Sequence, residues 1–309
     1  MTTFPADFIT SFNQFTASDC DRCAFIQNYL SAHGVETSLV PVEGKKHIYV
    51  RFSEASYSPL FHLKTIIAHY DRAPGSPGAN DNSSSVFSLM NFAVQLQNFR
   101  GIHNVRIFFT DGEELADGAE SVSGMGSYGL ANLLKKLGIK NDDVYVFDCT
   151  GRGDIPVLAQ TILPPGVSEN FSKQFTDLEN RTKSLIQSVS PYFLTLPVSY
   201  SDNAGFLACK IPAAALTMLP SAEASLYMRN VMESKDLETY VRRHRIYSNK
   251  NAAADSDVQI LKEFEIRKLL PETWQLFHTE HDSLETLTPE SFAVTEKILS
   301  ALALSKTLV

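Results

Sequence analysis

The sequence has no long hydrophobic run and no excess of basic residues. Its longest apolar stretches, such as residues 211–219, are well short of the ~20 residues that a transmembrane helix requires, so we expect no membrane span. Its 27 basic side chains are outnumbered by 35 acidic ones, which gives a formal net charge of -8. Because proteins that bind nucleic acids need a basic surface for the phosphate groups, we also expect no nucleic-acid partner.

Cysteine is scarce as well. Four cysteines in 309 residues are too few for a fold held together by disulfides. Residues 1–10 lack the basic cluster and apolar stretch of a secretory signal, so we expect a reducing compartment, the cytoplasm. Cys20 and Cys23 form a C-x-x-C pair, but Cys23, Ile26 and Leu30 have helical spacing. No second C-x-x-C completes a zinc site, and the pair is therefore interpreted as part of a packed helix.

The remaining composition is that of a globular protein, with 44% hydrophobic and 20% charged residues. Strand-like runs alternate with helix-like runs along much of the chain. The expected strands are 47–52, 63–68, 104–110, 143–148, 155–159 and 212–219, and the expected helices are 83–99, 126–137 and 289–305. This alternation predicts an α/β fold: a three-layer structure with a mostly parallel, twisted sheet and helices on both faces.

The domain organisation is expected to be simple. We expect one catalytic domain over residues 1–309, with a helical insert at about residues 220–272. The insert is charged and partly rich in alanine, and no strand follows it closely. It could be a lid, an oligomer contact or a peripheral subdomain, and its residues do not decide between these.

Polar side chains follow several of the predicted strands. They lie in the segments Ala68-His69-Tyr70-Asp71, Ser76 to Asn82, Thr110-Asp111-Gly112-Glu113-Glu114 and Phe147-Asp148-Cys149. Taken singly, each has an ordinary explanation, and Asp81-Asn82 before a helix is typical of an N-cap. Ligands of open parallel sheets bind at the carboxyl ends of the strands, however. So many acidic and imidazole groups could share one crevice only around a cation.

Zinc is the leading candidate for that cation, because it accepts histidine and carboxylate ligands and leaves a position open for water. A further ligand could come from His278 or His281, and their spacing does not choose between them.

These segments resemble the co-catalytic zinc exopeptidases, a family that includes bacterial leucyl-type aminopeptidases and, more distantly, glutamate carboxypeptidases and glutaminyl cyclases. The resemblance runs from Leu63 to the C-terminus, apart from the predicted insert. Its motifs, in chain order, are AHYD, SPGANDN, DGEE, VFD, SDN with a following IPAA, and H-T-x-x-D-S-L. The set is specific, since all six are very unlikely to occur in this order by chance.

The resemblance implies two zinc ions per chain. The ligands it implies are His69 and Asp148 for one zinc, Glu114 and His278 for the other, and Asp81 as the carboxylate that bridges both. It also implies a cis peptide bond between Asp81 and Asn82. His281 falls where the family has no ligand and is left with a role at the rim.

The same resemblance assigns catalytic roles to two further carboxylates. Glu113 resembles the general base, and Asp71 resembles the carboxylate that orients the ring of His69. Asp202, in the SDN motif, is predicted to bind substrate. The implied activity is that of an aminopeptidase, which removes N-terminal residues from peptides through a water that bridges the two zinc ions. Peptides are the expected partners, and the chain could form a homo-oligomer.

Three features depart from the family pattern. Residues 115–125 make a longer connection to Gly126-Ser127, which resembles the glutaminyl cyclases; Asn203 stands where the family often has histidine; and the insert precedes His278. The main alternative is therefore a glutaminyl cyclase-like acyltransferase with one zinc on Asp81, Glu114 and His278. The single tryptophan, Trp274, is not where the cyclases have theirs.

The sequence gives less support to a carboxypeptidase or to a protein without activity. A carboxypeptidase would need a cationic group for the terminal carboxylate, for which Arg72 and Arg152 are candidates. A binding protein without activity is disfavoured, because the ligands and the base are all present.

Overall fold

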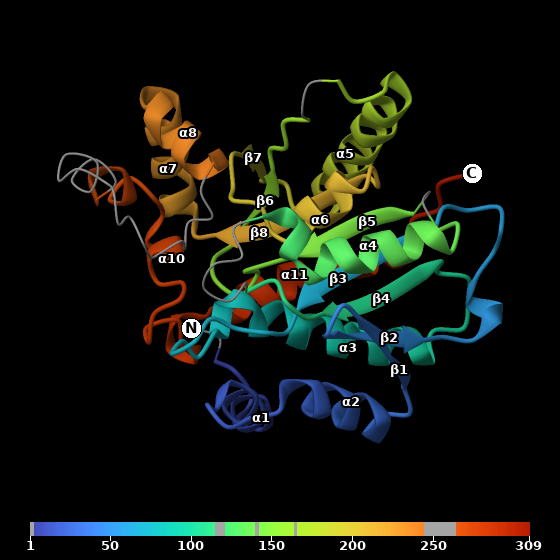
Figure 1. Cartoon of the computed structure of the whole chain (residues 1–309). Coiled ribbons are helices and arrows are strands. Elements are labelled where there is room, and N and C mark those ends of the chain that lie inside the picture. The colour runs from blue at the N-terminus through green and yellow to red at the C-terminus, as the bar shows by residue number, and fades with distance from the viewer. Residues whose placement is uncertain (1–2, 115–120, 140–141, 164–165, 244–263) are drawn as a thin grey trace.

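The described residues fold around an eight-stranded sheet (Figure 1). The computed structural model describes residues 3–114, 121–139, 142–163, 166–243 and 264–309. The strands, in chain order, are β1 (Glu36–Val42), β2 (Lys45–Arg51), β3 (Lys64–His69), β4 (Val105–Thr110), β5 (Asp143–Phe147), β6 (Ile155–Ala159), β7 (Leu194–Leu196) and β8 (Ala213–Leu219). Their order across the sheet is β1-β2-β4-β3-β5-β8-β6-β7.

The centre of the sheet is parallel. Strands β4, β3, β5 and β8 are parallel neighbours, and β7 is parallel to β6. The antiparallel pairs are β1 with β2, β2 with β4, and β6 with β8. All six residues of β3 are buried, as expected for a central strand covered on both faces. The parallel centre places the carboxyl ends of β4, β3 and β5 side by side at one edge.

Helices cover both faces of the sheet (Figure 1). On one face, the main core includes residues of α1 (Ala6–Thr16), α2 (Arg22–Ala32), α3 (Ser84–Asn98), α5 (Glu169–Val189) and α11 (Pro289–Leu304). On the other face, α4 (Gly126–Lys136) and α6 (Asn203–Ala208) form a second core. The side chains of β3 alternate between them, with Ile66 in the first core and Ile67 in the second. The predicted three-layer α/β fold is thereby confirmed.

The predicted insert is helical where the structure describes it. Its helices are α7 (Ser221–Glu233) and α8 (Lys235–Arg243), and α10 (Glu272–Gln275) follows. Their apolar residues, including Tyr227, Leu237 and Trp274, form a third core near β6 and β8. Residues 244–263, which fall in the middle of the predicted insert, lie outside the described residues.

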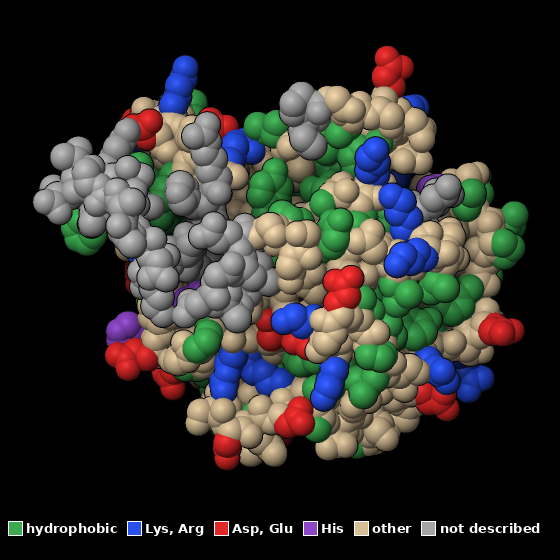
Figure 2. All heavy atoms as spheres, in the orientation of Figure 1, with side chains coloured by type: hydrophobic (Ala, Val, Ile, Leu, Met, Phe, Trp, Pro, Cys, Tyr) green, Lys and Arg blue, Asp and Glu red, His purple; other side chains and the backbone are tan. Residues whose placement is uncertain are grey.

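All four cysteines are free thiols, and the C-x-x-C pair packs against the main core at the start of α2. None of the described helices combines the length and apolar character of a membrane span. On the face shown in Figure 2, the basic side chains lie in small groups among acidic, apolar and neutral ones.

Candidate metal centre

The polar groups that follow the central strands meet at the carboxyl edge of the sheet. His69 is the last residue of β3, and Asp148 directly follows β5. Glu113 and Glu114 come shortly after β4, the strand that pairs with β3. Asp81 lies in the connection between β3 and α3, and His278 lies between α10 and α11. Five separate segments of the chain therefore contribute to one cluster.

The ligand atoms form two groups that share Asp81. In the first group, His69 Nε2 lies 3.2 Å from Asp81 Oδ1 and 3.6 Å from Asp148 Oδ1. In the second, His278 Nε2 lies 3.3 Å from Asp81 Oδ2 and 3.0 Å from Glu114 Oε1. Within each group all ligand atoms lie within 4.8 Å of one another. Asp81 thus directs one oxygen to each group.

These distances suit a zinc ion in each group. Nitrogen and oxygen ligands about 2.0–2.2 Å from a tetrahedral zinc are roughly 3.3–3.6 Å from one another. The side chains of His69 and Asp81 are almost fully buried, whereas those of Asp148 and His278 are 18% and 23% exposed. The cluster is therefore reached from the side of Asp148 and His278.

The crowding of carboxylates changes the protonation of both histidines. Burial lowers the pKa of His278, but Asp81 and Glu114 outweigh burial and raise this pKa to about 10. Burial likewise opposes the charged form of His69, yet Asp148, Asp71 and Asp81 raise its pKa well above the ordinary value. Burial and the charge of Asp81 together raise the pKa of Glu114 to about 7. The shifts of the two histidines reflect neighbouring carboxylates that favour positive charge, whereas burial is the largest cause of the shift of Glu114.

Asp71 connects the end of β3 to the segment after β4. Its Oδ1 lies 3.5 Å from His69 Nδ1, and it accepts hydrogen bonds from the backbone N–H groups of Glu113 (3.2 Å) and Glu114 (2.8 Å). Burial raises the pKa of Asp71, but His69 and these two N–H groups lower it overall. Asp71 can therefore orient the ring of His69 while it fixes the backbone that carries the two glutamates.

Two further residues hold the backbone around Asp81. Asp282, which is buried, accepts hydrogen bonds from the N–H groups of Asn80 (2.7 Å) and Asp81 (3.1 Å). The side chain of Asn82 donates to the carbonyl of Phe147 (3.0 Å) and accepts a hydrogen bond from the N–H of Cys149 (3.1 Å). It therefore holds the backbone on both sides of Asp148. The sequence did not predict these supporting hydrogen bonds; the inclusion of both residues in the family-like motifs was the available signal.

Asp81 and Asn82 do not cap α3, although capping is the ordinary explanation of the pair taken alone. Helix α3 begins at Ser84 with Ser83 as its N-cap, and the Asp81 carboxylate faces the two histidines instead. The peptide bond between Asp81 and Asn82 is cis, as predicted.

The remaining predicted residues lie around the cluster. Glu113 is 8% exposed and does not belong to either ligand group, although it is adjacent to Glu114. Asp202 has no exposed surface and accepts a hydrogen bond from the hydroxyl of Thr110, while burial raises its pKa to about 6. The substrate-binding role of Asp202 is not tested by these contacts and stays a prediction. The side chain of His281 is 70% exposed and lies outside both groups.

Known proteins of similar structure share this fold. The LapA aminopeptidase of Legionella pneumophila is 17% identical, with a TM-score of 0.63 over 98% of this chain and 72% of that one. A leucine aminopeptidase precursor from Bacteroides thetaiotaomicron is 15% identical, with a TM-score of 0.63 over 99% of each chain. The glutaminyl cyclase of Porphyromonas gingivalis is 16% identical, with a TM-score of 0.58 over 94% of this chain and 92% of that one.

A comparison with curated proteins gave no match. The sequence model of peptidase family M28 matches residues 62–303, a region that begins just before β3 and contains every residue of both ligand groups. The chain therefore belongs to peptidase family M28, which confirms its resemblance to the zinc exopeptidases.

Proposed function

We propose that this protein is a zinc-dependent aminopeptidase with two zinc ions in its active site. The observation that carries the proposal is the position of Asp81, whose two oxygens face two separate ligand groups. His69, Asp81 and Asp148 would hold one ion, and Asp81, Glu114 and His278 would hold the other. Membership of peptidase family M28 supports the same reaction class.

The roles of the surrounding residues follow from their positions. When bound, the two ions would supply Lewis-acid chemistry, which lowers the pKa of a water and stabilises the charge that develops on the scissile carbonyl. Glu113 takes the proton from the attacking water and returns it to the departing amine. Asp71 keeps Glu113 in place through its backbone N–H. The free α-amine of a peptide is attracted to this acidic cluster.

The two arginines considered as a clamp for a terminal carboxylate are engaged elsewhere. Arg72 donates to the carbonyls of Thr16 (2.7 Å) and Ala17 (3.1 Å). Arg152 forms ion pairs with Glu223 at 3.1 Å and Glu272 at 3.5 Å. Because both guanidinium groups already have partners, they favour an aminopeptidase over a carboxypeptidase.

A glutaminyl cyclase with one zinc is the second candidate, because two of the similar structures are glutaminyl cyclases. The only tryptophan of the chain argues against it. Trp274 is 2% exposed, and its ring packs edge-on against Tyr227 with 4.8 Å between the ring centroids. It belongs to the third core and not to the wall of a substrate pocket.

Zinc content and substrate choice together test the proposal. Chelated protein is reloaded with zinc, its metal content is measured by mass spectrometry, and hydrolysis is followed on free and N-blocked aminoacyl p-nitroanilides. We expect close to two zinc ions per chain and cleavage only where the α-amine is free. One zinc per chain, with ammonia released from an N-terminal glutaminyl peptide, would instead identify a cyclase.

We further propose that residues 1–309 act as one catalytic domain with a helical insert at about 220–272. The four free thiols favour the cytoplasm. Self-association also remains a prediction, which light scattering on the purified protein would test.

A further inference from the structure

Arg22, the first residue of α2, is a buried cation beside the proposed metal centre. Its side chain is 6% exposed, and it does not take part in any ion pair among the described residues. Instead, Nη1 donates to the carbonyl of Tyr70 at 3.1 Å and Nη2 donates to the carbonyl of Pro77 at 2.7 Å. These two carbonyls mark the two sides of the loop that leads from His69 to Asp81. One guanidinium thus closes the base of this loop.

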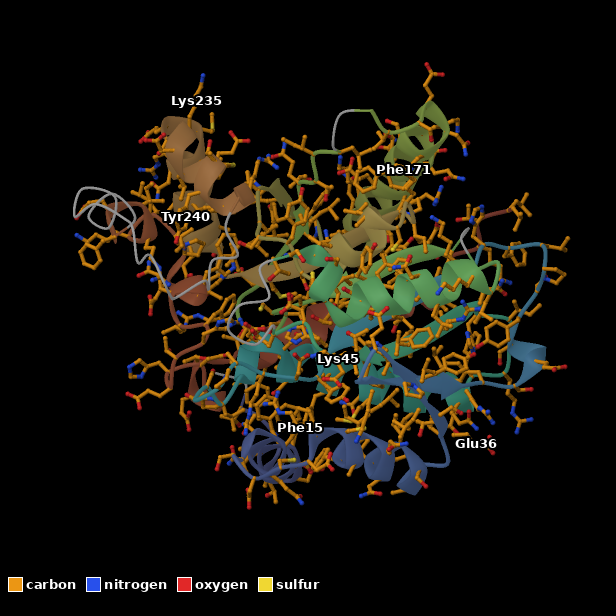
Figure 3. All side chains as sticks on the ribbon, viewed as in Figure 1. Phe15, Glu36, Lys45, Phe171, Lys235 and Tyr240 are labelled. Carbon is orange, nitrogen blue, oxygen red and sulfur yellow. The ribbon has the colours of Figure 1, made fainter. Side chains whose placement is uncertain are left out.

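Aromatic packing fixes the position of that guanidinium. Its central carbon lies 4.7 Å from the centroid of the Phe15 ring. Phe15 in turn packs against Phe25 of α2, with centroids 5.1 Å apart, and against Phe87 of α3, with centroids 5.5 Å apart. Figure 3 shows Phe15 between α1 and the body of the molecule. Helices α1 and α2 are therefore anchored on α3 independently of the metal centre.

The same loop also contacts the end of α1. Arg72 donates to the carbonyls of Thr16 and Ala17 at the end of α1. Within the loop, Gly78 leaves no space for a side chain: a Cβ there would lie 2.6 Å from the carbonyl oxygen of Asp81 and 3.4 Å from Nη2 of Arg22. Close packing thus extends from Arg22 through the loop to the backbone of Asp81.

We propose that Arg22 is a positioning residue for the metal centre, holding the loop of residues 70–78 so that Asp71 and Asp81 keep their geometry. This inference rests on the proposed function. Without Arg22, two carbonyls lose a charged donor and the loop must rearrange to find new partners. Arg22 lies outside residues 62–303, the region that the family model matches. Helix α2 would therefore support the metal site from outside that region.

Metal affinity distinguishes positioning from simple stabilisation. Arg22→Met keeps the length of the side chain but removes its charge and donors, and Arg22→Lys keeps the charge but loses the fork that can reach two carbonyls. Zinc affinity is measured by competition with a chelator, and site geometry by the absorption spectrum of the Co²⁺-loaded protein. We expect both variants to bind zinc ~10- to 100-fold more weakly, as for other residues that support metal ligands.

Arg106→Met is the matched control. Arg106 is largely buried and pairs with Asp142 at 2.7 Å, near the opposite ends of the strands. Its loss should lower the melting temperature of the chelated protein but leave zinc affinity and the cobalt spectrum unchanged. The proposal is overturned if Arg22→Met shows this same pattern. If Arg22→Met does not fold, the same measurements are made on Arg22→Lys and Phe15→Leu. Unchanged zinc affinity and an unchanged cobalt spectrum in both variants would then overturn the proposal.

The wild-type protein separates the two proposals. If it binds zinc and the folded Arg22 variants bind it equally well, the inference about Arg22 fails alone. If the wild-type protein binds no zinc, the proposed function fails first, and the inference fails with it.

Discussion

At the level of single residues, Asp81 is where the two halves of the proposed active site meet. Its oxygens lie 3.2 Å from His69 and 3.3 Å from His278. Its backbone N–H is held by Asp282. Because each of the other ligands belongs to one group only, the consequences of losing Asp81 differ from those of losing any other ligand.

Asp81→Ala is therefore expected to release both zinc ions, since each remaining group would keep two ligands. Asp148→Ala is the matched comparison and should release one ion, because the group of Asp81, Glu114 and His278 stays complete. Zinc per chain, measured after dialysis at fixed free zinc, checks both variants. Two ions retained in Asp81→Ala would contradict the bridging role.

Glu113→Gln should separate metal binding from catalysis. The amide has the shape of the carboxylate but cannot accept the proton of the attacking water. Both ligand groups lack Glu113, so two zinc ions should remain bound while kcat falls by ~10²- to 10⁴-fold. Steady-state kinetics and zinc analysis on the same preparation provide the check. Parallel loss of metal and activity would show that Glu113 is not the base.

Zinc affinity should depend steeply on pH. In the metal-free protein the pKa of His278 is about 10 and that of Glu114 about 7, so His278 carries a proton throughout the neutral range. Zinc binds only the deprotonated imidazole. Between about pH 7 and 10 the affinity of this position should thus fall by about tenfold for each unit that the pH falls, and faster below about pH 7, where Glu114 is protonated as well. Calorimetry in buffers of different ionisation enthalpy should detect the released proton, and pH-independent affinity would refute the assignment of His278.

At the level of elements, the strands and helices of the sheet's centre could be predicted, because hydrophobic periodicity reports burial directly. Helix α3 occupies Ser84–Asn98, within the predicted helix 83–99, and its residues Val86, Met90 and Ala93 are buried. Helix α5 was not predicted, although Phe171, Phe175 and Leu178 carry the same period. Strand β1 was also missed. It lies at the edge of the sheet and none of its residues is buried, so it carries no comparable signal.

The contact between α4 and the segment after β4 yields a prediction at this scale. The N–H of Gly126 donates to the carbonyl of Gly112 at 2.9 Å, and a Cβ on Gly126 would lie 1.7 Å from the carbonyl oxygen of Asp111. Gly126→Ala must displace this backbone, at a cost of about 1–3 kcal/mol or more in the free energy of unfolding. The displaced segment carries Glu114, so zinc should bind less tightly at the second position.

Gly138→Asn is the control for this substitution. Gly138 has a φ of 80° and open space around it, and asparagine tolerates this conformation better than other residues with a side chain. Chemical denaturation of the chelated protein and zinc titration should show little change. Equal effects of the two substitutions would mean that the contact with Asp111 has no special importance.

At the level of the whole molecule, the sequence predicted which residues meet but not what supports them. The rule for parallel sheets predicted one crevice around a cation, and the resemblance to the zinc exopeptidases named both ligand groups and separated His278 from His281, which spacing alone did not. The contacts of Arg22 with Tyr70 and Pro77 span 48 and 55 residues. Such contacts depend on how α2 docks against the rest of the protein, and a local pattern carries no sign of them.

Because its ligands come from segments between residues 69 and 278, zinc should stabilise the whole fold. An ion that binds only the folded chain adds about 2.7 kcal/mol when its free concentration is 100 times Kd, which corresponds to an increase of ~4 °C in Tm for a chain of this length. Thermal unfolding of chelated protein, followed during stepwise addition of zinc, should show Tm rising with the logarithm of zinc concentration. Asp81→Ala should abolish most of this dependence and should also lower the Tm of the chelated protein, because without metal the buried Asp81 carboxylate pairs with protonated His69 and His278. A full zinc response in that variant would mean that the stabilising ion binds elsewhere on the molecule.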